Sequence, residues 1–162
     1  MKYFLACITI AVFCCAPAAA APCAGPAYHQ FDFFVGNWTV TNKAGKTVGS
    51  DAVTKKMNDC VIFERWRDAT GPGSGFGITG FQAGRHTWHQ TFMDDTGLVL
   101  TLDGALENGG MHLRGTDYPT TSARLNDVLW TRHGNVVEEL WRVSIDRGRT
   151  WKTVFDGFFH RR

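Results

Sequence analysis

The chain has little proline, little excess charge of either sign and no long apolar run beyond its first residues. Of its 162 residues only 5 are proline, and 17 basic side chains stand against 15 acidic ones, for a net charge of +2. This even balance argues against a nucleic-acid footprint, so no nucleic-acid partner is expected. With 44% apolar residues, the composition also excludes a disordered or collagen-like chain. The length is that of one ordinary domain.

The one long apolar run lies at the N-terminus. Lys2 precedes an apolar stretch of about 14 residues, which a string of alanines follows. A basic start, a short apolar stretch and small residues before a cleavage point are typical of a secretory signal peptide. The stretch is shorter than the roughly 20 residues that span a bilayer, so no membrane span is expected after cleavage. We predict a signal peptide over 1–20, cut after Ala20, one mature domain over 21–162, and export to the periplasm or the outside of the cell.

Two of the five cysteines, Cys23 and Cys60, lie beyond the predicted signal peptide. An even pair in an exported domain is expected to form a disulfide, because the compartments outside the cytoplasm are oxidising. Such a bridge would close a loop of about 38 residues and, in the chain-entropy model, contribute roughly 4 kcal/mol. Two free buried thiols are the alternative.

The rest of the chain alternates between apolar and polar residues in short segments. Turn-forming residues, among them Asn108-Gly109 and the stretch 71–73, recur at spacings of roughly 8 to 14 residues. Between them the repeat is two residues, as in half-buried antiparallel strands, and no window shows the 3.6-residue repeat of a helix. The alternation predicts ten strands, at 37–43, 46–57, 60–69, 75–83, 86–94, 98–106, 111–118, 123–132, 136–145 and 150–160.

These strands predict an all-β fold, a single antiparallel meander barrel. Ten strands in one domain must close or stack to remove their edges, and short, even connections favour closure. A two-sheet sandwich is the alternative. A barrel of eight to ten strands has an interior able to hold a small ligand. We expect the barrel to be a monomer.

Gly36 and Trp38 open the first predicted strand, just after an aromatic cluster over 31–34. A Gly-x-Trp at this place is similar to the lipocalin-type barrels, in which the Trp closes one end and a late basic residue packs over its ring. Here that residue would be Arg161 or Arg162, and a cation over an indole contributes roughly 0.5–2 kcal/mol. The resemblance implies structural roles for Gly36, Trp38 and Arg161.

Four longer phrases occur in order: FDFFVGNW at 31–38, CVIFERW at 60–66, WHQTFMDDTG at 88–97 and LWRVSIDRGRTW at 140–151. Together they resemble an uncharacterised family of bacterial exported proteins with a lipocalin-like, calycin-type barrel. The resemblance covers 23–162 and implies the fold and export, and no reaction. The chain departs from the family's pattern at Phe34, Asn37, Phe92 and Arg142 and over 75–82.

The segment 144–151 also fits the Ser-x-Asp-x-Gly-x-Thr-Trp pattern of the Asp-box of sialidase propellers. Its physical content is a hairpin in which Asp146 accepts turn N–H groups, Gly148 takes a positive φ and Trp151 packs beneath. A propeller needs several copies, and this chain has one. We therefore interpret Ser144, Asp146, Gly148 and Trp151 as structural, with a glycosidase as the alternative.

Metal and haem sites require histidines that converge. His86 and His89 stand three apart on a predicted strand, so they face opposite sides, and three others stand singly near strand ends, His112, His133 and His160. We therefore predict no metal site and no cofactor. A haem barrel with a single axial histidine, such as His160, is the alternative.

Catalytic motifs are scarce in this sequence. It has no Gly-x-Ser-x-Gly phrase and no mature cysteine to spare for nucleophilic chemistry. The acidic pair Glu138 and Glu139 occupies neighbouring strand positions that face opposite ways, and Asp94 with Asp95 is interpreted as turn chemistry. No enzyme is predicted; an enzyme acting inside the barrel is the alternative.

Indoles and a few polar side chains are expected to face the barrel interior. If Trp66 and Trp88 point inward, the period of two brings Glu64 and Gln90 inward too. Such a lumen suits a small hydrophobic or aromatic molecule. The predicted ligand site consists of Glu64, Trp66, Trp88, Gln90, Glu139 and Trp141.

Glu64 can contribute to this site only if its side of the strand faces the barrel interior. Because Cys60 and Ile62 share that face, it is expected to be the buried one. A carboxylate there is poorly solvated, so it needs a partner or stays protonated. In the alternative, Glu64 pairs with Arg142 or Arg132 inside a filled core.

Overall fold

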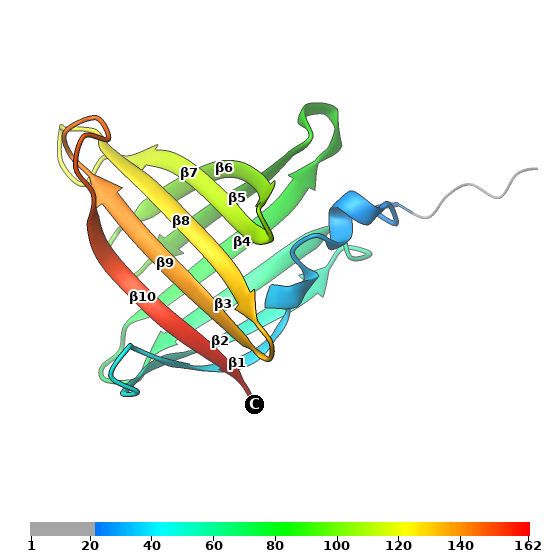
Figure 1. Ribbon diagram of the computed structural model, residues 1–162, viewed down its shortest axis with the longest axis horizontal. Coiled ribbons are helices and arrows are strands. Elements are labelled where there is room, and N and C mark those ends of the chain that lie inside the picture. Colours follow the sequence, from blue (N-terminus) through cyan, green and yellow to red (C-terminus); the bar gives the residue numbers. More distant parts are fainter. Residues whose placement is uncertain (1–21) are drawn as a thin grey trace, which may run out of the picture.

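The computed structural model describes residues 22–162, so the predicted signal peptide and its cleavage point lie outside the described residues. The chain is all-β (Figure 1). Each predicted strand matches one in the structure, and every end agrees within two residues. The strands are β1 (Gly36–Thr41), β2 (Thr47–Lys56), β3 (Val61–Asp68), β4 (Ser74–Gln82), β5 (Thr87–Asp94), β6 (Val99–Glu107), β7 (Gly110–Asp117), β8 (Arg124–His133), β9 (Val136–Ser144) and β10 (Lys152–Arg161).

Three short 3-10 helices accompany the strands, η1 (Pro26–His29), η2 (Asp32–Phe34) and η3 (Ala83–Arg85). After η3, His86 takes a left-handed conformation with a φ of 50°. It therefore belongs to the connection before β5. The prediction that His86 and His89 lie on one strand is wrong for this reason. Over 22–162, no helix has the length and apolarity needed to cross a membrane.

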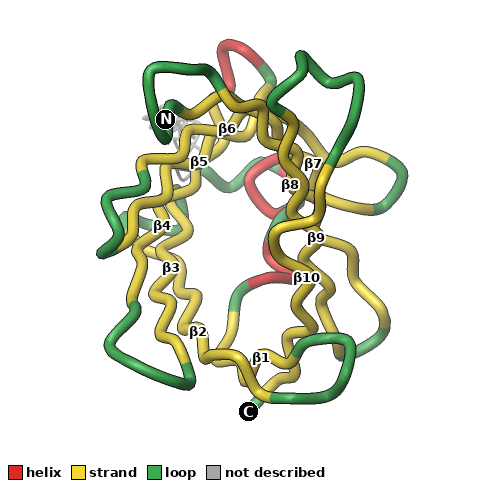
Figure 2. Tube along the Cα trace, turned by 90° about the vertical axis from the view of Figure 1, so that its left-hand side faces the viewer, coloured by secondary structure: helices red, strands yellow, loops and turns green. Residues whose placement is uncertain are grey.

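The ten strands close into a barrel in which every neighbouring pair is antiparallel (Figure 2). Each strand pairs with the next along the chain, and β1 completes the ring against β10, with Trp38 opposite Arg161. Closure leaves no unpaired sheet edge. The predicted single antiparallel meander barrel is confirmed, and the sandwich alternative is wrong.

Side chains alternate between a lumen face and an outer face along each strand. On β3, Ile62 and Glu64 are buried, whereas Phe63 packs on the outside against Phe76 of β4. The face shared by Ile62 and Glu64 is therefore the inner one.

Residues 22–35 close one end of the barrel, which we call the plug end. There η1 and η2 lie across the ring of strands (Figure 2), and Phe31 between them is fully buried, with 0% of its surface exposed. The Phe31 ring lies 5.2 Å from that of Phe34, 5.9 Å from Trp88 and 5.3 Å from Trp130, between centroids. We call these four rings the aromatic plug.

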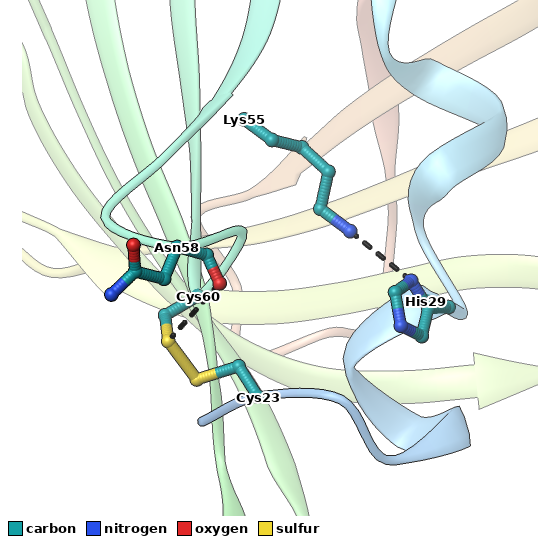
Figure 3. Close-up of a disulfide and its surroundings, with 5 residues drawn as sticks. All are labelled: Cys23, His29, Lys55, Asn58 and Cys60. Carbon is teal, nitrogen blue, oxygen red and sulfur yellow. Dashed lines mark hydrogen bonds between the residues drawn. A yellow bond between two sulfur atoms is a disulfide. The ribbon is translucent and has the colours of Figure 1, made fainter. Parts of the chain in front are cut away.

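A disulfide fastens this segment to the barrel (Figure 3). Cys23 is bonded to Cys60, in the turn between β2 and β3, as predicted. Beside it, Lys55 Nζ of β2 donates to Asp32 Oδ1 at 2.6 Å and lies 3.3 Å from His29 Nδ1. One covalent bond and one ion pair thus hold the segment across the barrel mouth.

Trp38 and Arg161 complete the plug end. Trp38 is buried and donates from Nε1 to the carbonyl oxygen of Phe34 at 2.9 Å. The Arg161 Cζ lies 4.5 Å from the Trp38 ring centroid, and its Nη2 donates to the carbonyl oxygen of Val35 at 3.2 Å. Of the two arginines considered, Arg161 rather than Arg162 lies over the indole.

Candidate functional site

A cavity of about 300 Å³ occupies the lumen beyond the aromatic plug. Trp130 of the plug forms part of the cavity wall. The lining extends to Gly73 and Ser74 at the start of β4 and to Asp95 and Thr96 after β5. These turns lie at the barrel end opposite the plug, where the connections after β1, β3, β5, β7 and β9 gather. We call this end of the barrel the loop end, and the cavity lies nearer to it than to the plug end.

Five of the six predicted site residues line this cavity, namely Glu64, Trp66, Gln90, Glu139 and Trp141. The sixth, Trp88, points inward but sits in the aromatic plug, and its Nε1 donates to Gln30 Oε1 at 3.0 Å. The period of two gives the side of a strand on which a residue lies. It does not give the height along the barrel, which separates Trp88 from Gln90.

Other wall residues were not predicted. Phe92 has the same parity as Gln90 on β5, so the alternation could have found it. Phe155 contributes from β10, where its ring packs edge-on against Trp66 at 5.8 Å between centroids. Nothing in the sequence pairs these two rings, because β3 and β10 are separated by β1 and β2 in the ring of strands.

The Glu64 side chain reaches from β3 across β4 to β5. It is 6% exposed, and its Oε2 accepts a hydrogen bond from Gln90 Nε2 of β5 at 3.2 Å. Gly77 is its cross-strand neighbour on β4, and a Cβ atom there would lie 2.5 Å from that oxygen. The glycine therefore leaves the space in which the Glu64 side chain crosses β4 and contacts β5.

Two further carboxyls face the same interior. Asp51 of β2 is 3% exposed; its Oδ1 accepts from the Arg65 backbone N–H at 3.2 Å, whereas its buried Oδ2 has no hydrogen-bond partner among the described residues. Glu139 of β9 accepts from Trp130 Nε1 through Oε2 at 3.1 Å. We call Asp51, Glu64 and Glu139 the lumen carboxyls.

Burial raises the pKa of each lumen carboxyl, because the charged form loses its hydration. The pKa rises to about 6 for Asp51 and to about 8 for Glu139. That of Glu64 rises well above its ordinary value, first through burial and then through the charges of Asp51 and Glu139. A pKa of about 8 favours the protonated form of Glu139 near neutral pH, and the upward shift of the Glu64 pKa acts in the same direction.

Within residues 22–162, no arginine forms an ion pair with a lumen carboxyl, so the alternative in which Glu64 pairs with an arginine is wrong. Arg142 lies on the outer face, where its Nη2 donates to Asp127 Oδ1 at 2.9 Å. The Arg132 Nε donates to the carbonyl oxygen of Gly134 at 2.9 Å. The cause is the strand alternation, which turns each arginine away from the inward residues of its own strand.

The loop end of the cavity is also acidic, but its carboxylates are engaged in turns. Asp94 Oδ1 accepts from the backbone N–H of Thr96 at 2.9 Å and of Leu98 at 3.1 Å. Asp95 Oδ2 accepts from the backbone N–H of Ser74 at 2.8 Å. This is the turn chemistry expected for the two aspartates, and it holds the β5–β6 connection against the start of β4.

Histidines do not line the cavity over residues 22–162. His160 is exposed and its Nε2 lies 3.1 Å from Thr41 Oγ1, while His89 Nδ1 lies 2.8 Å from Asp103 Oδ1. A haem bound in this lumen would therefore find no axial histidine there. Within the same range, no group of three or more His, Cys, Asp or Glu side chains is arranged to hold a metal ion.

The motif over 144–151 forms a hairpin turn at the loop end and does not line the cavity. Asp146 Oδ1 accepts from the Thr150 backbone N–H at 2.9 Å and from Ser144 Oγ at 2.7 Å, and the motif's glycine has a φ of 83°. Hydrogen bonds from Thr150, and then from Ser144, lower the pKa of Asp146 to about 2. Trp151 is 39% exposed, so it covers the turn less closely than the pattern predicts.

The described residues thus form a closed ten-stranded antiparallel barrel with a buried aromatic plug. Beyond the plug lies a cavity lined by indoles and carboxyls. The resemblance to exported lipocalin-like barrels depends on the phrases quoted above and on the packing of Arg161 over Trp38. In comparisons with known proteins, no family model and no curated protein matches this chain.

Proposed function

We propose that the protein is an exported lipocalin-like barrel that binds a small aromatic or apolar molecule in its lumen. One observation carries the proposal, the cavity of about 300 Å³ with Trp66, Trp130 and Trp141 in its wall. Ligand sites are concave, mostly apolar and furnished with a few placed polar groups. The volume suits a molecule of one or two rings.

Two features of the plug end support the wider proposal. The Cys23–Cys60 disulfide favours export, because such bonds persist in oxidising compartments. The Arg161–Trp38 packing is what the resemblance to lipocalin-type barrels implies. Closure of one end by residues 22–35 leaves the loop end as the route by which a ligand would enter.

Titration of the purified protein with small aromatics and fatty acids, followed by tryptophan fluorescence and native mass spectrometry, tests the proposal. We expect saturable quenching or a spectral shift, because three indoles line the cavity. Leu100→Phe places bulk in the cavity wall and should weaken binding at least about tenfold, since overpacking is poorly tolerated. Its control is Val99→Phe, the next residue on the outer face, which is exposed. Failure of every compound to bind would overturn the proposal.

A second candidate is acid catalysis in the same lumen. It is favoured by the position of Glu139 in the cavity wall, where its carboxyl accepts from Trp130 Nε1 and burial raises its pKa to about 8, which keeps a proton available near neutral pH. Time-dependent conversion of a bound compound, lost in Glu139→Gln, would favour the enzyme. Stoichiometric binding without conversion would favour the first proposal, a protein that binds its ligand without changing it.

A further inference from the structure

We infer that the lumen site takes an organic cation, a small protonated or quaternary amine that carries an aromatic ring. This inference rests on the proposed binding function of the same cavity and names its ligand class. Three properties of the described residues support it: the charge of the wall, the balance of hydrogen-bond donors and acceptors, and the arrangement of the indoles.

The wall carries acidic groups and no basic one. Glu64 and Glu139 line the cavity, with Asp68 and Asp94 nearer the loop end, and no Lys, Arg or His of residues 22–162 is among the lining residues. Lys55, which lies on β2 as Asp51 does, is occupied by Asp32 of the plug end. Once ionised, these carboxyls would repel an anionic ligand, whereas a cation would supply a counter-charge that no Lys, Arg or His of the described lining provides.

The hydroxyl and indole donors of the wall are engaged, and its carboxyls become pure acceptors when they ionise. Its hydroxyl groups are engaged, since Ser74 Oγ donates to Asp95 and Thr96 Oγ1 donates to Asp94. Glu64 accepts a side-chain hydrogen bond from Gln90 and shares a second with Asp51, and its ionised form keeps acceptor capacity for a ligand N–H. An ammonium group has only donors, so it complements this wall.

The indoles present rings rather than N–H groups to a ligand. Trp66 Nε1 donates to Asp68 Oδ1 at 2.6 Å, and Trp141 Nε1 donates to Asn126 Oδ1 at 2.8 Å. The Trp130 N–H is likewise taken, by Glu139. With their N–H groups bound within the wall, the rings are fixed, and an indole face attracts a cation within about 6 Å, more strongly when both are desolvated.

A cation should also exchange with protons in the lumen. Glu64 is faced by Asp51 of β2, Gln90 of β5 and Glu139 of β9, and both acids raise its pKa through their charges. Binding of a cation favours the ionised carboxyls, so it should release protons and tighten as pH rises. The gain should approach tenfold per pH unit where one proton is released, and it should level off above the raised pKa of Glu139, about 8.

Calorimetric titration with a matched set of compounds tests the inference. The set is 2-phenylethylamine, its neutral counterpart 2-phenylethanol and the anion 3-phenylpropanoate, each measured from pH 6 to 8.5 in two buffers of different ionisation enthalpy. We expect the amine to bind at least about tenfold more tightly than the alcohol at pH 8, and only the amine to show a buffer-dependent heat. Glu64→Gln and Glu139→Gln should reduce the amine's advantage and leave the alcohol unchanged, because the amide cannot carry the charge. Glu138→Gln, on the outer face of the same strand, is the control.

Each outcome decides one of the two proposals. Equal binding of amine and alcohol, or tightest binding of the propanoate, overturns the cation and leaves the binding function standing. If none of the three compounds nor the wider panel binds, both proposals fall. Should a glutamine variant not fold, the pH and buffer dependence of the unaltered protein still decides, since a binding heat independent of buffer contradicts proton release.

Discussion

The two ends of this barrel are both rich in aromatic rings, and they use them differently. At the plug end, Phe31 and Phe34 fill the space between Trp88 and Trp130, and the rings are fully buried. Toward the loop end, Trp141 lies against a cavity of about 300 Å³. The difference comes from residues 22–35, which cross one mouth of the barrel and not the other. Aromatic content alone therefore does not identify a binding site; the segment that covers the rings decides.

The ends also differ in how charge is balanced. At the plug end, Lys55 is paired with Asp32, and Arg161 lies over Trp38. In the cavity wall, Glu64 and Glu139 have no basic partner among the described residues, and neither has the buried Asp51 beside them. The paired charges and close packing of the plug end stabilise the fold. The buried carboxyls beside the cavity lower the stability of the fold, and they are available to bind a ligand.

The largest effect is expected from removing a ring at the plug end. Phe31→Ala should lower the free energy of unfolding by roughly 3–5 kcal/mol, because it opens a cavity in a filled region. Phe155→Ala, in the cavity wall, should cost less than half as much, since its ring already borders open space. Urea denaturation of both variants measures the difference. Equal costs would show that the two regions are packed alike.

A smaller effect is expected from pH. The pKa of Glu139 is about 8 in the folded protein against an ordinary 4.5, so between these values the folded state holds a proton that the unfolded state has released. The free energy of unfolding should therefore fall as pH rises through this window, by about 1–2 kcal/mol after allowance for solvent and for coupling to Glu64. Glu139→Gln should flatten the fall and Glu138→Gln should not, in urea titrations at stepped pH. An unchanged slope in Glu139→Gln would contradict the assignment.

The smallest effect is expected at the hairpin of 144–151, outside both regions. Asp146→Ala removes the acceptor of the Thr150 N–H, so amides of the turn should exchange faster while ligand binding stays unchanged. Because the pKa of Asp146 is lowered to about 2 from 3.8, its stabilisation is present above pH 3.8 and is lost as pH falls toward 2. Hydrogen exchange measures the effect, with Arg149→Ala in the same turn as control. Loss of binding in Asp146→Ala would instead connect the turn to the cavity.

Local patterns were enough to predict the strands. Asn108 and Gly109 form the turn between β6 and β7, both with positive φ, as an Asn-Gly hairpin requires. The same alternation places Glu139 and Trp141 on the inner face of β9, and it already implies that Arg142, next to Trp141, points outward. The alternative in which Glu64 pairs with Arg142 could therefore have been rejected on information that the sequence contained.

What the sequence by itself determined was the set of strands and the order of the meander, and it favoured a Cys23–Cys60 disulfide and an inward Glu64 without deciding either. The strands and their order depend on neighbours within a few residues, and the disulfide prediction depended on Cys23 and Cys60 being the two cysteines beyond the predicted signal peptide. Only the tertiary structure decided that Trp88 belongs to the plug while Gln90 faces the cavity, and that Asp51, Glu64 and Glu139 meet without a basic residue. The physical reason is that height along a barrel depends on the stagger of all ten strands and on where residues 22–35 end inside it. A period of two residues carries neither quantity.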